Sequence, residues 1–89
     1  MNVFFTDHGW DDYLYWCRHD TDTLRRINEL IEAARRSPFA GIGKPEPLKG
    51  DFAGCWSRRI TREHRLVYAV EGKPGSDQRI IIVMCRYHY

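Results

Sequence analysis

The first part of the chain carries apolar residues at helical spacing. Residues 3–5 are a short apolar run that predicts a strand, and Thr6 or Asp7 can cap the helix that follows. Apolar side chains then recur at positions i, i+3, i+4 and i+7, which predicts one apolar stripe along that helix. The stripe consists of Trp10, Tyr13, Leu14 and Cys17.

A second helix is predicted after a polar break over residues 18–22. Asp20 or Thr21 can cap this helix, and Ser37 with Pro38 ends it. Two helices joined by so short a link form a hairpin, which must cover an apolar surface elsewhere in the fold. The apolar positions of the second helix are Leu24, Ile27, Leu30, Ile31 and Ala34.

Residues 39–54 are predicted to be a loop, because six glycines and prolines interrupt them. A loop of this length in a small domain is usually functional or mobile.

Three runs rich in β-forming residues complete the chain. They cover residues 55–60, 65–70 and 79–87, joined by a tight connection over 61–64 and a longer hairpin loop over 71–78. We therefore expect an α+β fold with an N-terminal strand, a two-helix hairpin and an antiparallel three-strand meander. The strands form a twisted sheet with the helices on one face.

A chain of 89 residues has room for one domain, which we assign to residues 1–89. Its 43% hydrophobic and 29% charged content excludes an intrinsically disordered chain. The longest apolar run, residues 80–85, is too short for the ~20 residues of a membrane span, and no signal peptide is visible. Cys17, Cys55 and Cys85 share no C-x-x-C spacing, so we expect neither a disulfide framework nor a zinc site, and a cytoplasmic location.

The net charge of +2 is unevenly distributed. Residues 1–34 carry three arginines against seven acidic residues, for a net charge of −4, whereas residues 35–65 have a net charge of +5 and residues 66–89 of +1. This asymmetry favours a polyanion, such as a nucleic acid, as partner of the middle of the chain. Solvated faces with local ion pairs are the alternative.

Glu46 stands between two prolines. Pro47 restricts Glu46 to an extended backbone, and Pro45 stiffens the approach to it. A carboxylate held in this way at small entropic cost suits acid–base chemistry, while a solvated loop glutamate is the alternative.

Two arginines lie near the ends of the predicted tight connection. Arg59 and Arg65 can project from one sheet face together with Ser57 and Thr61. The two parallel N–H donors of a guanidinium match two phosphoryl oxygens, so this pair favours phosphate binding. Surface arginines that pair with nearby carboxylates are the alternative.

The predicted last strand runs almost to the end of the chain, so we expect His88 to be held in place. Histidine donates or accepts a proton near neutral pH, although a lone histidine can also be structural, and no spacing here indicates a metal. A carboxylate, arginines and a histidine without a metal motif can cleave RNA, because the ribose 2′-OH supplies the nucleophile. DNA lacks this hydroxyl.

Six ordered strings, spread over nearly the whole chain, are jointly specific. They are W-D-D-Y-L-Y-W (10–16), I-N-E-L-I (27–31), G-K-P-E-P-L-K (43–49), W-S-R-R-I (56–60), E-H-R-L-V-Y (63–68) and C-R-Y-H-Y (85–89). Together they resemble the YoeB (Txe) toxins of the RelE/ParE toxin superfamily. One departure is the loop over residues 72–78, which is longer than the usual connection before the last strand.

This resemblance implies a RelE-like microbial RNase fold and a toxin of a type II toxin–antitoxin system. Such a toxin enters the ribosomal A site and cuts translated mRNA there, as a metal-independent endoribonuclease without a cofactor. The resemblance further implies that Glu46 is the general base, Arg65 the phosphate-stabilising arginine and His88 the general acid. Whether Glu46 removes the proton or orients the substrate stays open. The implied substrate-binding residues are Lys49, Arg59 and Tyr89.

The partners implied by the resemblance are a YefM/Phd-type antitoxin with an acidic tail, the 70S ribosome and mRNA. The chain is expected to form a homodimer or a toxin–antitoxin hetero-oligomer, to reach operator DNA only through the antitoxin complex, and to bind no membrane. Trp16 and Phe39 belong either to the core or to one of these interfaces. The alternative functions are a ParE-like non-nuclease toxin that acts on a topoisomerase, and an RNA-binding module.

Overall fold

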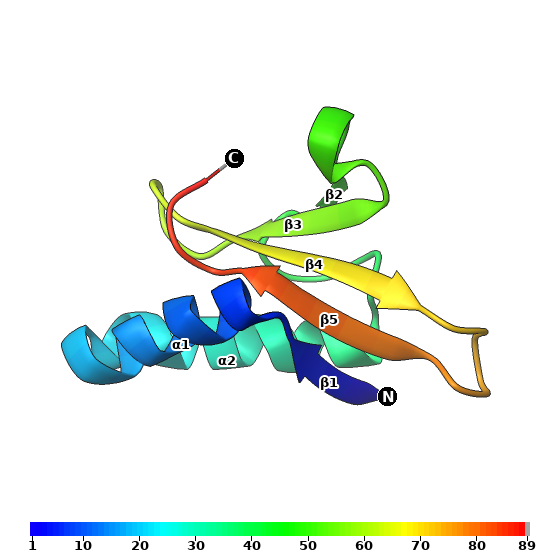
Figure 1. The fold of residues 1–89 in the computed structure, drawn as a ribbon, viewed down its shortest axis with the longest axis horizontal. Helices are drawn as coiled ribbons and strands as arrows, with labels where there is room; N and C mark the ends of the chain where they lie inside the picture. The colour runs from blue at the N-terminus through cyan, green and yellow to red at the C-terminus, as the bar shows by residue number, and fades with distance from the viewer. Residues whose placement is uncertain (89) are drawn as a thin grey trace.

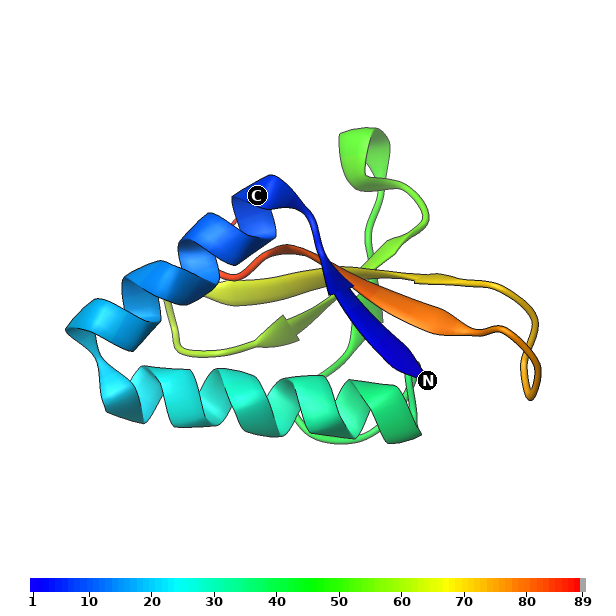
Figure 2. The same cartoon turned by 60° about the horizontal axis from the view of Figure 1, so that its bottom comes forward.

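The computed structural model describes residues 1–88 as two layers, a five-stranded sheet with two helices packed on one of its faces (Figure 1). The predicted α+β architecture with both helices on one face is confirmed, and Figure 2 shows the two helices joined end to end as a hairpin. In chain order the elements are β1 (Asn2–Phe5), α1 (Asp7–His19), α2 (Thr21–Arg36), β2 (Glu46–Pro47), the 3-10 turn η1 (Gly50–Phe52), β3 (Cys55–Arg59), β4 (Arg65–Glu71) and β5 (Arg79–Met84).

Both helices begin at predicted caps. The Thr6 hydroxyl accepts a hydrogen bond from the Gly9 N–H at 3.0 Å and donates to the Ile82 carbonyl at 3.3 Å. The Asp20 carboxylate accepts from the Thr23 N–H at 3.1 Å. Each cap satisfies an amide that has no partner within its own helix, and Thr6 also ties the start of α1 to β5.

The predicted meander of β3, β4 and β5 forms the centre of the sheet, and two short strands extend it to the order β1-β5-β4-β3-β2. β1 pairs parallel with β5, and β2 pairs antiparallel with β3. β2 corrects the prediction that residues 39–54 contain no regular element. Its Pro47 is tolerated because β2 is an edge strand, where one side needs no partner.

The last strand ends at Met84 and does not reach residue 87 as predicted. Tyr87 has a backbone φ of 62°, which lies in the left-handed region and cannot continue a strand. The chain therefore leaves the sheet as a C-terminal tail, which we define as residues 85–88. In Figure 1 the tail lies at the opposite end of the sheet from the long β4–β5 connection. An ion pair of 2.9 Å between Arg79 and Glu71 closes the base of that connection.

The core lies between the sheet and the helices. α2 faces it with the predicted apolar positions, of which Ile27, Leu30 and Ala34 have no exposed surface. On the sheet side, the side chains that meet them come from β4 and β5. The fully buried ones are Leu66, Tyr68, Ile80 and Ile82.

The buried side of α1 differs from the predicted stripe. Trp10 is 46% exposed and Cys17 lies on the surface, whereas Gly9 and Trp16 are buried. Aromatic residues occur all around this helix, so their spacing does not select one face. Gly9 does, because a Cβ there would overlap the Ile82 carbonyl oxygen, and α1 therefore packs its backbone directly against β5.

Candidate functional site

The sheet face opposite the helices, which we call the open face, carries three of the predicted site residues, Glu46, Arg59 and Arg65. In the sheet register Glu46 pairs with Ser57, and Arg59 pairs with Arg65 two positions further along β3 and β4. Side chains at this spacing leave the same face. The Cα atoms of Glu46 and Arg65 are separated by two strand spacings and two residues along the strands, or about 12 Å. Glutamate and arginine side chains can reach one ligand across such a gap.

Arg59 and Arg65 lie directly opposite each other on neighbouring strands. Like charges in this position destabilise a sheet, and an anion bound between them would remove the repulsion. Nη1 of Arg65 donates to the carbonyl oxygens of Thr61 at 2.8 Å and His64 at 3.1 Å, which anchors the guanidinium at the β3–β4 turn. Within residues 1–88, Nε and Nη2 have no acceptor, so three N–H donors are available to a ligand.

The other predicted site residues are exposed. In the described part of the chain, the side chains of Glu46, Lys49, Arg59 and His88 form no hydrogen bond or ion pair. β2, η1 and the tail that carries His88 all rise on the open-face side of the sheet (Figure 1). Tyr89, the remaining predicted residue, lies outside the described residues.

A buried arginine holds the loop that leads into β2. Arg58 has no exposed surface, and it donates from Nε to the Tyr68 hydroxyl and from Nη1 to the Ile42 carbonyl, both at 2.9 Å. Nη2 donates to the carbonyl oxygens of Ser37 at 2.7 Å and Ala40 at 2.8 Å. The loop is thereby closed around the guanidinium.

Among the described residues, every hydrogen-bond acceptor of the Arg58 cation is a neutral oxygen atom, and its guanidinium carbon also lies 5.7 Å from the centre of the Tyr68 ring. Tyr68 completes the network by donating to the Pro38 carbonyl at 2.7 Å. Burial raises the pKa of the Tyr68 phenol, and the adjacent Arg58 partly opposes this. In the sequence Arg58 stands out only as one of several basic residues, but its position between Trp56 and Ile60 on the apolar side of β3 indicates burial.

The C-terminal tail is anchored to α1. Trp16 Nε1–H donates to the Cys85 carbonyl at 2.7 Å, and the Asp12 carboxylate accepts from the Cys85 N–H at 3.0 Å. The guanidinium carbon of Arg86 lies 3.5 Å from the centre of the Tyr15 ring, a cation–π contact. The prediction of a held chain end is confirmed for residues 85–87, whereas His88, for which it was made, is exposed. Trp16 therefore belongs to the core.

His64 connects the tail to the β3–β4 turn. Its Nδ1 accepts a hydrogen bond from the Tyr87 N–H at 2.6 Å, and the Tyr87 carbonyl accepts from the Arg65 N–H at 2.8 Å. The His64 ring also packs edge-on against Trp16, with a centroid distance of 4.8 Å. From the sequence, no role was predicted for His64. Its place immediately before Arg65 in the E-H-R-L-V-Y string is the signal that could have indicated one.

All three cysteines are free. Burial raises the pKa of the Cys85 thiol to about 12, so this thiol is neutral and unreactive near pH 7. Among residues 1–88, no group of three or more histidine, cysteine, aspartate or glutamate side chains is arranged to hold a metal ion. None of the described helices combines the length and apolar character needed to cross a membrane.

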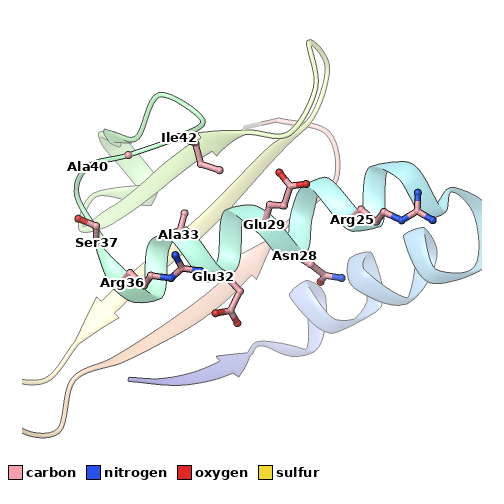
Figure 3. Close-up of a pocket in the computed structure, with 10 residues that line it drawn as sticks. Arg25, Asn28, Glu29, Glu32, Ala33, Arg36, Ser37, Ala40 and Ile42 are labelled. Carbon is pink, nitrogen blue, oxygen red and sulfur yellow. The ribbon is translucent and has the colours of Figure 1, made fainter.

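A separate surface groove of about 770 Å³ runs between α2 and residues 40–42 (Figure 3). Ala33, Arg36 and Ile42 are among its lining residues, and no predicted site residue lines it. Phe39 is 52% exposed, and its ring contacts Trp56 at a centroid distance of 4.9 Å.

Comparison with known proteins relates the chain to one family over almost its whole length. The model of the YoeB-like toxin of bacterial type II toxin–antitoxin systems matches residues 5–89. Toxin YoeB of Escherichia coli strain K12 is 54% identical over 89 residues, an alignment that covers both chains completely.

Solved structures show the same relationship. The YoeB/ParE toxin from Agrobacterium tumefaciens is 56% identical, with complete coverage of both chains and a TM-score of 0.93. The YoeB–YefM complex from Staphylococcus aureus contains a chain that is 41% identical with a TM-score of 0.86, and a YoeB dimer from the same organism is 42% identical with a TM-score of 0.87. Both alignments cover all of this chain and 98% of the other. The similarity thus includes both helices and the whole sheet.

Proposed function

The chain belongs to the YoeB-like toxins of bacterial type II toxin–antitoxin systems, and we propose that it is a ribosome-dependent endoribonuclease that cuts translated mRNA in the ribosomal A site. The observation that carries the proposal is the cross-strand pair of Arg59 and Arg65 on the same sheet face as Glu46. The two cations suit the negatively charged phosphodiester, and the carboxylate suits the hydroxyl that attacks it.

The proposed reaction uses the ribose 2′-OH as nucleophile. Glu46 removes or orients the 2′-OH proton, O2′ bonds to phosphorus, and the P–O5′ bond breaks. His88 donates a proton to O5′, so the products are a 2′,3′-cyclic phosphate and a 5′-OH. The Nε and Nη2 donors of Arg65, which have no acceptor among residues 1–88, stabilise the negative charge that develops on the phosphorane oxygens. Lys49, Arg59 and Tyr89 are proposed to bind the substrate.

The expected contributions are large. Loss of one donor to a developing oxyanion costs about 10²–10³ in rate, and loss of a general acid costs about 10²–10⁴. We therefore expect mRNA cleavage to collapse in Arg65→Ala and His88→Ala. Because Arg65 also anchors a turn, Arg65→Lys is included, and it keeps the charge but loses the fork of donors.

The test is induction of each variant in cells, with mapping of mRNA 5′ ends and chemical identification of the new termini. Breaks within translated codons that carry 5′-OH ends support the proposal. Arg25→Ala and His19→Ala are the matched controls, because both residues are exposed on the helices away from the open face. Full cleavage by both Arg65→Ala and His88→Ala would refute it, and DNA damage without RNA breaks would favour the topoisomerase-directed alternative.

We further propose that this chain pairs with a YefM-like antitoxin, as the name of the Staphylococcus aureus complex states for that relative. Lys49 and Arg59, which are exposed cations without a partner among residues 1–88, would attract an acidic antitoxin tail. Homodimers, toxin–antitoxin hetero-oligomers and operator binding through the antitoxin complex are part of the same proposal. Affinity for the antitoxin should fall as salt rises, because salt screens exposed charges, and an affinity that salt leaves unchanged would contradict it.

A further inference from the structure

The strongest feature that the proposed mechanism does not use is the contact between His64 and the tail. A backbone N–H can only donate, so the His64 Nδ1 that accepts from Tyr87 at 2.6 Å must carry no proton. A protonated imidazole has N–H groups at both nitrogens and cannot accept this bond. The contact therefore exists only with neutral His64.

The same contact supports an unfavourable backbone. Tyr87 has a φ of 62°, in a region that bulky residues rarely adopt and that persists only where neighbouring contacts impose it. Two backbone hydrogen bonds impose it here, one to His64 and one from Arg65. His88 is the next residue, so the conformation of Tyr87 sets the direction in which the chain presents His88.

Charged groups surround the imidazole on several sides. Glu63 lies next to it on the turn, Arg86 and His88 come from the tail, and Asp20 and Arg62 line the same surface cleft of about 310 Å³. Burial lowers the pKa of His64, the Glu63 carboxylate opposes this, and the electrostatic interactions with Arg86 and His88 lower it further. The neutral form required by the hydrogen bond thus predominates at pH 7.

We propose that His64 is a positioning residue whose neutral imidazole holds Tyr87 in its left-handed conformation and thereby places His88 over the open face. Protonation of His64 removes the acceptor and releases the end of the tail. The anchors of the tail at Cys85 and Arg86 do not depend on His64. At Tyr87 the bond from the Arg65 N–H to the carbonyl remains without its partner bond to His64, so release begins at Tyr87. The consequence for RNA cleavage rests on the proposed function, whereas the consequence for the tail does not.

Asparagine and leucine form a matched pair of substitutions at this position, because their side chains have the same branched shape. His64→Asn places an amide oxygen near the position of Nδ1 and accepts a hydrogen bond at any pH. His64→Leu offers no acceptor. Both remove the imidazole and its packing on Trp16, so any difference between them reports the hydrogen bond alone.

The primary measurement is hydrogen exchange of the Tyr87 amide by NMR on the free chain, with the His64 ring resonances followed in the same samples. As the pH is lowered, we expect the protection factor of the Tyr87 amide in the unsubstituted chain to fall about tenfold, which is the effect of losing one hydrogen bond. The midpoint of this fall should coincide with the pH at which the His64 ring resonances titrate. His64→Asn should keep its protection over the same pH range, and His64→Leu should lack it throughout.

Equal protection in His64→Asn and His64→Leu, or unchanged protection while the ring titrates, would overturn the proposal. If His64→Leu fails to fold, the comparison of the unsubstituted chain with His64→Asn decides alone. In the ribosome assay, His64→Leu should lower kcat with little change in KM, and His64→Asn should restore kcat. Absence of cleavage by the unsubstituted chain would refute the proposed function and leave the amide measurement valid, while pH-independent protection would refute only the role of His64.

Discussion

Replacing Arg58 with lysine should destabilise the protein more than replacing it with methionine. Arg58 is fully buried and makes four hydrogen bonds, all to neutral oxygens. Lysine keeps the buried charge but offers only three donors, so one of the four bonds is lost by number alone. We expect a second to be lost, because a single nitrogen atom cannot reach acceptors that are spread around the guanidinium fork. Charge-assisted hydrogen bonds contribute about 1.5–3 kcal/mol each, and water that reaches the exposed loop replaces part of what is lost. We therefore expect a loss of about 3–4 kcal/mol, from a total of roughly 4–13 kcal/mol for a domain of this size.

Methionine removes the buried charge together with its desolvation cost, which is why we expect it to be less harmful. Urea unfolding measures the stability of both variants, and the urea concentration at which half of the lysine variant is unfolded should be lower by about 2 M than for the unsubstituted chain. Cleavage by chymotrypsin after Phe39 should accelerate in both variants, because the loop loses the side chain around which it closes. Tyr68→Phe is the control, because it removes only the phenol that links Arg58 to Pro38. A lysine variant that loses under about 1 kcal/mol, or one that is more stable than the methionine variant, would refute this account of the buried charge.

Further predictions concern the packing of α1 and the buried thiol. Gly9→Ala should cost about 1–3 kcal/mol in thermal unfolding despite alanine's better helix propensity, because the new Cβ overlaps the Ile82 carbonyl, and an unchanged Tm would contradict this. Burial raises the pKa of Cys85 to about 12 from an unfolded value of 9.0, so the thiol of the unfolded chain loses its proton at lower pH than the thiol of the folded chain. The contribution of the neutral thiol to the free energy of unfolding is therefore fully present below pH 9 and is lost as the pH rises toward 12. The full effect is about 4 kcal/mol, and urea unfolding of Cys85→Ala should lack this alkaline loss. In the native protein, a thiol reagent should modify the exposed Cys17 well before Cys85, and equal rates would show that Cys85 is accessible.

Local chemistry in the sequence predicted the helices and the central strands well. The side chains of Thr6 and Asp20 cap their helices by accepting from an amide three residues further along the chain. Because this interaction is local, the start of each helix could be predicted from the sequence alone. The alternation along β3 and β4 likewise indicated that Arg59 and Arg65 share a face, and their register confirms it.

Pairing between distant segments was less visible. β2 consists of two residues in a loop rich in glycine and proline, and it is a strand only because the edge of β3 accepts it. Likewise, nothing near Gly9 in the sequence shows that its backbone meets Ile82, more than 70 positions away.

The sequence by itself determined where the two helices start, the meander and the strings that identify the family, because these depend on neighbouring residues and on their order along the chain. Only the tertiary structure decided that Arg58 is a buried support for the loop and that His64 holds Tyr87. The same side chain can be a solvated cation, a proton donor or a hydrogen-bond acceptor. Which of these it becomes depends on the atoms that the fold places around it.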